Sequence, residues 1–199
     1  MRLTIIALYI APIFQTVAAF TPESLPGAVA PLGFFDPLGF AAKADANTLK
    51  RYREAEITHG RVAMLVSVGF LVGEQVEGSS FLFDASVSGP AITHLEQTPT
   101  PFWTALVIAI TNAELYRARR GWVEPVDVPA DQPGLLREDY IPGDLAWDPL
   151  GLKPTEPVEF EMMQTKELQN GRLAMLAAAG FMAQELVDGK GIIEHLQSA

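Results

Sequence analysis

The sequence has no cysteine, only three histidines and few charged residues, and each scarcity removes a class of function. Without cysteine there are no disulfides, zinc-thiolate sites or thiol nucleophiles. His59, His94 and His195 are too few and too scattered for a histidine-based metalloenzyme. A net charge of −10 gives nucleic-acid binding little electrostatic support. Because no clustered nucleophile, base or phosphate-binding loop is present either, we expect neither an enzyme nor a nucleic-acid binder.

Hydrophobic residues make up 49% of the 199-residue chain, and the mean hydropathy is +0.18. These values lie between those of a soluble globule and an all-membrane protein, as expected for a few spanning helices joined by polar loops. Apolar segments occur at about 52–76, 101–117 and 162–187. We therefore predict an all-α membrane protein with three transmembrane helices, in a single domain of residues 20–199.

The first 19 residues are typical of a signal-type targeting presequence. Arg2 gives a positive start, an apolar stretch follows, and small residues precede the expected cleavage site. A first transmembrane helix is the alternative, but about 17 apolar residues interrupted by Pro12 and Gln15 are marginal for a span of roughly 20. The A-A-F-T-P junction resembles the bipartite presequences of secondary plastids of red-algal origin. Phe20 would then open either the mature chain or a second targeting segment.

Residues 56–74 and 167–185 are copies of each other, with 9 identities in 19 positions. Upstream, FFDPLGF at 34–40 repeats as AWDPLGL at 146–152. A turn followed by a long helix was therefore used twice, with an unrelated helix between the copies. Because a single helix separates them, both copies should cross the membrane in the same direction.

Lysine and arginine gather on one side of the predicted membrane. They precede the first helix, follow the second and precede the third, whereas the 76–100 loop has none and the C-terminal tail has only Lys190. Three spans with the N-terminus on the basic side satisfy the positive-inside bias throughout. In a plastid that side is the stroma, so we predict a stromal mature N-terminus.

Charged residues lie inside the first and third apolar segments, where an unpaired charge is costly. A solvated lead-in over 51–61 would avoid the cost, but it would not explain why both copies keep the same Glu–Arg spacing. We predict instead a pseudo-twofold crossed pair of helices locked by reciprocal ion pairs. Glu56 would pair with Arg172. Glu167 would pair with Arg61, and small residues would allow close approach at the crossing: Gly60, Ala63, Gly69, Gly171, Ala174 and Gly180.

A carboxylate bridged by one arginine keeps lone pairs that it can offer to a metal. His59 and Asn170 follow the two glutamates by three residues, and each has a donor atom suited to magnesium in a porphyrin. Chlorophyll magnesium needs one axial ligand from the protein, so single donors spread along apolar helices fit pigment binding. Gln184 is a further amide donor near the end of the third segment. For Asn170 the alternative is a hydrogen bond within the helix pair.

The motifs E-x-x-H-G-R-x-A-M and E-x-x-N-G-R-x-A-M resemble the first and third transmembrane helices of the light-harvesting chlorophyll-binding family, and most closely its fucoxanthin chlorophyll a/c type. The similarity covers about residues 31–195. It implies axial chlorophyll ligands at Glu56, His59, Glu114, Glu167, Asn170 and Gln184. It also implies structural ion-pair arginines at Arg61, Arg172 and Arg117. The turns at Asp36 and Asp148 resemble the segments that hold two carotenoids, with plain turns as the alternative.

Departures from the green-plant branch of this family change some expectations. The C-terminal histidine ligand there aligns with Ala199, and the nearby His195 is predicted to be an ordinary surface residue. Leu106 replaces a polar residue of the middle helix, so the site tied to chlorophyll b is predicted to be altered or lost. His94 and Gln97 in the lumenal loop have donors that could bind a pigment, although an ordinary loop role is the favoured interpretation.

The resemblance implies an antenna that binds chlorophyll a, chlorophyll c and fucoxanthin or a related carotenoid and passes excitation energy to a photosystem. Metal would enter only as chlorophyll magnesium. The expected partners are a photosystem core, other antenna subunits and thylakoid lipids, in an oligomer or a photosystem-bound state. One alternative is a photoprotective, energy-dissipating member of the family, with lumenal carboxylates that could titrate: Glu74, Glu77, Asp84, Glu96, Glu185 and Asp188. A small membrane carrier is disfavoured because the repeat is parallel rather than inverted.

Overall fold

The computed structural model describes residues 25–79, 86–130 and 132–198. The predicted presequence, Phe20, Asp84 and Ala199 lie outside the described residues. The described part of the chain holds five helices and two isolated bridges but no strand, which confirms the expectation of a helical protein.

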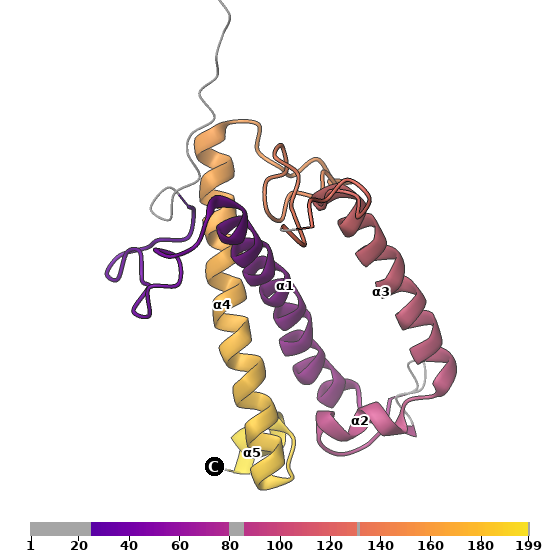
Figure 1. Cartoon of the computed structure of the whole chain (residues 1–199). Coiled ribbons are helices and arrows are strands. Elements are labelled where there is room, and N and C mark those ends of the chain that lie inside the picture. The colour runs from indigo at the N-terminus through magenta and orange to yellow at the C-terminus, as the bar shows by residue number, and fades with distance from the viewer. Residues whose placement is uncertain (1–24, 80–85, 131, 199) are drawn as a thin grey trace, which may run out of the picture.

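Three long helices dominate the fold: α1 (Ala46–Val76), α3 (Thr100–Gly121) and α4 (Pro157–Asp188). Two short helices, α2 (Ala91–Gln97) and α5 (Ile192–Ser198), follow α1 and α4. Figure 1 shows α1 and α4 crossing each other, with α3 standing apart from the pair. The segments before α1, after α3 and before α4 gather at one end of the molecule, whereas α2 and α5 lie at the other end.

The helices α1 and α4 begin several residues before the apolar segments that predicted them. Residues 46–51 include Ala, Leu, Lys and Arg, which are good helix formers although they are not all apolar. Pro157 lies in the first turn of α4, where its missing N–H has no helical partner to lose. Hydropathy therefore marks only the apolar part of each helix, and the helix itself continues into the polar end.

The crossing of α1 and α4 lies at two glycines that the repeat makes equivalent. A Cβ added at Gly60 would lie 3.0 Å from the Cα of Gly171, and one added at Gly171 would lie 2.9 Å from the Cα of Gly60. Ala63 and Ala174 are also buried in this seam. The expectation was wrong for the remaining two small residues, because Gly69 and Gly180 are exposed and a Cβ there would meet nothing within 4 Å. Each lies nine residues, about two and a half helical turns, beyond the glycine at the crossing, so it faces away from the partner helix.

Beyond the crossing, the two helices exchange contacts in a pseudo-symmetric way. Phe70 and Phe181, which are equivalent in the repeat, have ring centroids 6.0 Å apart. Glu74 of α1 accepts hydrogen bonds from the backbone N–H of Ile192 and Ile193, both at 2.8 Å, at the start of α5. Glu185 of α4, only 2% exposed, accepts one at 2.7 Å at the start of α2. Each long helix therefore holds the short helix that follows its partner.

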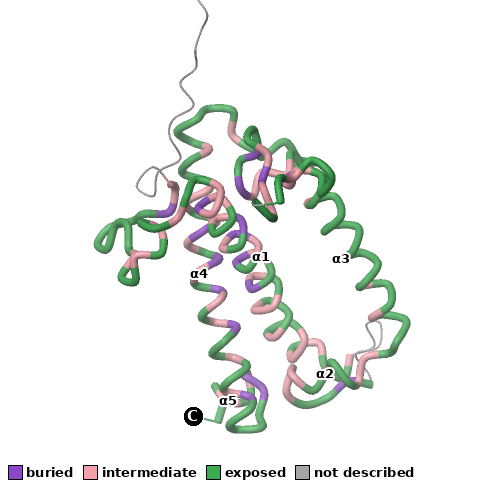
Figure 2. The backbone as a smooth tube through the Cα atoms, viewed as in Figure 1, coloured by how far each residue is buried: buried purple, intermediate pink, exposed green. Residues whose placement is uncertain are grey.

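Much of the apolar surface of the described chain faces outward. Figure 2 shows α3 exposed along most of its length, and Gly121 is its one buried residue. By length and composition, α1 is the one helix among the described residues that is long and apolar enough to cross a membrane. α4 is longer still, but its first half carries several charged side chains.

Candidate functional site

The charged residues of the repeat meet across the helix pair at the end that carries the long loops. Arg61 Nε donates to Glu167 Oε1 at 2.7 Å, and Arg172 Nε donates to Glu56 Oε1 at 2.7 Å. All four side chains are between 28% and 39% exposed. The structure therefore brings together the residues that the sequence placed in reciprocal pairs.

Each arginine also holds a glycine carbonyl from the segment that precedes the opposite helix. Arg61 Nη2 donates to Gly143 O at 2.9 Å, and Arg172 Nη1 donates to Gly27 O at 2.7 Å. Both glycines have positive φ, 83° and 100°, which an L side chain rarely adopts. Sequence reasoning missed these contacts, although a signal was present: a Pro-Gly dipeptide precedes each D-P-L-G turn.

His59 and Asn170 adopt the same orientation on the two crossing helices. His59 Nδ1 lies 2.7 Å from the carbonyl O of Ala55, and Asn170 Nδ2 donates at 2.8 Å to the carbonyl O of Lys166. A carbonyl oxygen only accepts, so His59 Nδ1 carries the proton; in the neutral ring Nε2 then has a lone pair that no described residue engages. Asn170 likewise keeps its Oδ1 lone pairs. Both side chains are exposed on the outside of the pair.

The glutamates predicted as ligands differ in how many of their oxygens are already paired. Glu167 Oε2 accepts no hydrogen bond from the described part of the chain, whereas Glu56 Oε2 lies 3.2 Å from an Arg53 nitrogen. On α3, Glu114 Oε2 takes both Nε and Nη2 of Arg117, at 2.9 and 2.7 Å. Its Oε1 accepts nothing within the described ranges. Glu114 and Glu167 thus each keep an oxygen that no arginine uses, whereas both oxygens of Glu56 face an arginine.

A buried carboxylate on α1, Glu54, was not among the predicted site residues. It is 3% exposed and accepts from Arg117 Nη1 at 3.0 Å, from the Tyr140 hydroxyl at 2.9 Å and from Gly143 N at 2.8 Å. Burial and the hydrogen bond to Glu54 raise the pKa of Tyr140 well above its usual range. Arg117 was predicted as a structural ion-pair arginine, and its contact with Glu54 was not foreseen. The sequence gives little signal for the wider role, because the repeat places a threonine, Thr165, at the position of Glu54.

At the opposite end of the molecule, Gln184 lies in a small polar cluster with Asp188 and His195. Gln184 Nε2 donates to Asp188 Oδ2, and His195 Nδ1 lies 2.8 Å from the same oxygen. Gln184 Oε1 accepts no hydrogen bond from the described residues, so it too keeps free lone pairs. His94 and Gln97 instead bond to backbone groups of Gly89 and Ser88, and these contacts hold the loop before α2.

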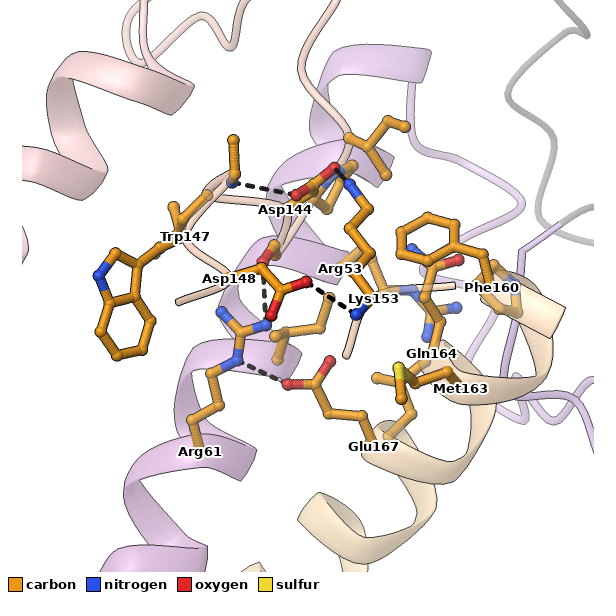
Figure 3. A pocket seen from close by; sticks show the side chains of 18 of the residues that line it. Arg53, Arg61, Asp144, Trp147, Asp148, Lys153, Phe160, Met163, Gln164 and Glu167 are labelled. Carbon is orange, nitrogen blue, oxygen red and sulfur yellow. Dashed lines mark hydrogen bonds and ion pairs between the residues drawn. The ribbon is translucent and has the colours of Figure 1, made fainter. Parts of the chain in front are cut away.

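Two cavities flank the helix pair, and each is walled by one copy of the D-P-L-G segment. The first, about 500 Å³, lies between α1, α4 and residues 141–153, and Figure 3 shows Arg61 and Glu167 facing each other across its floor. The second, about 1030 Å³, is formed with residues 25–41. Arg53 lines both cavities and is only 10% exposed.

The two aspartates of the D-P-L-G segments shape their own turns. Asp36 accepts from the N–H of Phe40 and Ala41 at 3.0 and 2.8 Å. Asp148 accepts from the N–H of Leu152 and Lys153 at 3.0 and 2.8 Å, and these bonds lower the pKa of Asp148. Their direct role is therefore to close a turn at the rim of each cavity.

The arrangement suits the binding of several ligands through one donor each. Among the described residues, no group of three or more acidic or histidine side chains gathers as a metal site would require. Single lone pairs on Glu, His, Asn and Gln are instead distributed along three apolar helices. Such donors can each complete the coordination of a metal that already sits in a macrocycle.

Comparisons with known proteins agree with this chemistry. A family model described as Chlorophyll A-B binding protein matches residues 21–186. Light-harvesting complex stress-related protein 3.2 of Chlamydomonas reinhardtii is 54% identical over 92% of this chain and 70% of that protein. A fucoxanthin-chlorophyll a-c binding protein of Isochrysis galbana is 52% identical over 83% of this chain and 77% of its own length. A chlorophyll a-b binding protein of Petunia hybrida is 33% identical over 88% of this chain and 66% of its own length.

These matches confirm the resemblance that the two E-x-x-[HN]-G-R-x-A-M motifs indicated, and they confirm that chlorophyll binding rather than catalysis is the activity to be explained. The chain belongs to the chlorophyll a-b binding protein family of light-harvesting proteins.

Proposed function

We propose that this chain is a thylakoid antenna that binds chlorophyll a, chlorophyll c and fucoxanthin or a related carotenoid and passes excitation energy to a photosystem. The observation that carries the proposal is the matched orientation of His59 and Asn170. They occupy equivalent positions of the repeat, lie one turn from the two interhelix ion pairs, and present their free lone pairs outward. Two pseudo-symmetric axial ligands are what a pair of central chlorophylls requires.

The remaining pigment sites follow from free donor atoms and from the cavities. Glu114, Glu167 and Gln184 would each hold one chlorophyll magnesium through an oxygen that its structural partner does not occupy. Glu56 would do so through Oε2, which an Arg53 nitrogen approaches to 3.2 Å. The two cavities beside the D-P-L-G turns would each take the end of a carotenoid lying along the helix pair. The protein thus supplies ligands, distances and local fields, while the pigments perform the photophysics.

The same proposal includes the topology. α1, α3 and α4 would span the thylakoid membrane, with the mature N-terminus in the stroma and residues 1–19 removed as a presequence. The Glu56–Arg172 and Glu167–Arg61 pairs would lock α1 to α4 and neutralise charges that the bilayer would otherwise penalise. Support comes from the positions of the loops: the basic segments share one end of the molecule, and α2 and α5 share the other. A photosystem core, other antenna subunits and lipids would cover the exposed apolar faces.

A photoprotective, energy-dissipating role has comparable support. Relatives at 52–54% identity carry the name light-harvesting complex stress-related protein. Two carboxylates also hold the short helices at the end that would face the lumen. Glu74 of α1 accepts from the start of α5, and Glu185 of α4 accepts from the start of α2. Protonation of Glu185 would weaken its bond to the backbone N–H of Ile92, so acid in the lumen could loosen the contact between α4 and α2.

One experiment separates the two roles. The protein purified with its pigments should show chlorophyll c and carotenoid absorption, and exciting either pigment should yield chlorophyll a emission. The absence of chlorophyll c, or of transfer from it, would refute the proposed antenna. The chlorophyll a fluorescence lifetime is then compared at neutral and acidic pH, with a Glu185→Gln variant as reference. A lifetime that shortens in acid in the native protein and not in the variant favours the dissipative role, and an unchanged lifetime favours harvesting.

A further inference from the structure

The repeat creates two equivalent docking positions beside the helix pair, and they differ in the side chain that accepts from the N–H of the docked glycine. At the first position, Gly143 N donates to Glu54 on α1 at 2.8 Å, and Gly143 O accepts from Arg61. At the second, Gly27 N donates to Thr165 on α4 at 3.2 Å, and Gly27 O accepts from Arg172. Glu54 and Thr165 stand 111 residues apart, the same shift that relates the two copies. A buried carboxylate thus replaces a hydroxyl in one copy.

The unrepeated helix α3 docks at the copy that carries the carboxylate. Arg117 Nη1 reaches Glu54 at 3.0 Å and Thr58 Oγ1 at 3.3 Å, both on α1. Because α3 has only Gly121 buried, apolar packing does little to place it. A single helix beside a pseudo-twofold pair needs an asymmetric contact to choose a side. The Glu54–Arg117 ion pair is such a contact.

The Glu54 side chain is held in one orientation, because its carboxylate is buried and both of its oxygens accept hydrogen bonds. A carboxylate that is 3% exposed is costly unless it is paired, and here three groups donate to it: Arg117, Tyr140 and Gly143. The same Arg117 guanidinium clasps Glu114 through its other two nitrogens. Because the guanidinium is planar and rigid, the bond to Glu54 fixes the plane in which Arg117 donates to Glu114.

We infer that Glu54 is the positioning residue for the middle helix: it selects the side of the α1–α4 pair on which α3 docks, and through Arg117 it fixes the direction in which Glu114 presents its free oxygen. The part of the inference that concerns a pigment rests on the proposed role of Glu114 as a chlorophyll ligand. The part that concerns α3 does not. Glu54 also touches Gly143, which Arg61 holds, so one hydrogen-bonded chain connects Glu114 on α3 to Glu167 on α4.

The test exchanges the residue that accepts from the docked glycine in each copy. Glu54→Thr installs the residue of the second copy, and Thr165→Val is the control that removes the equivalent bond on the other side. Because the chain has no cysteine, Arg119→Cys and Glu161→Cys can carry spin labels on exposed positions of α3 and α4. The doubly labelled protein with Glu54 and Thr165 unchanged, and the same protein with Thr165→Val, should each give one narrow distribution of the distance between the two labels. Glu54→Thr should give a broad or shifted distribution, and pigment analysis should show the loss of about one chlorophyll.

A second variant covers the case in which Glu54→Thr does not fold. Glu54→Gln keeps an oxygen for Tyr140 and Gly143 but loses the charge that holds Arg117, so the same changes should follow with smaller amplitude. An unchanged narrow distribution in Glu54→Gln would overturn the inference. Glu114→Leu tests the ligand role separately: if it loses no chlorophyll, the ligand assignment fails, and the spin-label distances still decide the role of Glu54.

Discussion

Gly60 and Gly171 touch backbone to backbone where α1 crosses α4, with an added Cβ on either residue lying 3.0 Å or less from the Cα of the other. The neighbouring atoms belong to main chain, which cannot move aside as a flexible side chain would. Gly60→Ala should therefore force the helices apart and cost about 1–3 kcal/mol. Gly69→Ala is the matched control, since a Cβ there meets nothing within 4 Å. Thermal unfolding of both variants, reconstituted with pigments, checks the difference, and equal stability would place the crossing elsewhere.

Arg61→Leu should destabilise assembly more than it affects any single pigment. It would leave the Glu167 carboxylate and the Gly143 carbonyl without their shared donor. We expect a loss on the order of 3 kcal/mol, near the lower end for a buried pair because both side chains are about a third exposed. The measurement is reconstitution yield and Tm. Arg119→Leu, an exposed arginine at the same end of the molecule, should behave like the wild-type protein, and an equally mild effect of Arg61→Leu would contradict the locking role.

The contacts between α1 and α4 were largely predictable from the sequence, because both helices carry the same pattern of charged and small residues. Two copies of one Glu-to-Arg spacing predicted which residues would meet, and the contacts at Arg61 and Arg172 join those residues. Small residues were a weaker guide. Gly69 and Gly180 share the repeat but lie about two and a half turns from Gly60 and Gly171, so they face away from the partner helix and make no contact there.

The contacts that the sequence did not reveal are those that occur in one copy or in the loops. Glu54 has a threonine as its counterpart, so no repetition drew attention to it. Its partner Tyr140 lies in an irregular segment, where hydrophobic periodicity carries no information. The close contacts of Gly27 and Gly143 depend on a positive φ and on chain approach in three dimensions, which the Pro-Gly pairs hint at only after the fold is known.

The loop that contains Asp148 should show a small dependence on acid. Hydrogen bonds from the backbone N–H of Lys153 and Leu152 lower the pKa of Asp148 below its usual value. A depressed folded-state pKa stabilises the fold above the unfolded pKa of about 4, and this stabilisation is lost as pH falls through the lowered value. Asp148→Asn should therefore lower the Tm at neutral pH, with the difference fading in strong acid. Asp139→Asn, an exposed control nearby, should have no such effect. A Tm difference between wild type and Asp148→Asn that grew in acid would contradict a lowered pKa for Asp148.

The proposed topology predicts a protease pattern on intact thylakoids. Protease added from the stromal side should remove the segment before α1 and cut between α3 and α4, where many of the described residues are exposed. The 77–99 connection between α1 and α3 should stay intact until the membrane is opened with detergent. Mass spectrometry of the fragments reads the result directly. Cleavage within 77–99 from outside would reverse the assignment of sides.

Pigment binding itself is tested most directly at Asn170. Asn170→Leu keeps the volume and the apolar surroundings but removes the Oδ1 lone pairs, and Asn112→Leu on α3 is the control that loses the same kind of bond to a carbonyl four residues earlier. If Asn170 only bonded within its helix, its loss would cost about 1 kcal/mol and leave the spectrum unchanged. The account predicts instead that Asn170→Leu loses about one chlorophyll a with a discrete bleach in the red band, while the control keeps every pigment. Pigment stoichiometry by chromatography decides the matter, and a full complement of chlorophyll with an unaltered red band in Asn170→Leu would contradict the central claim.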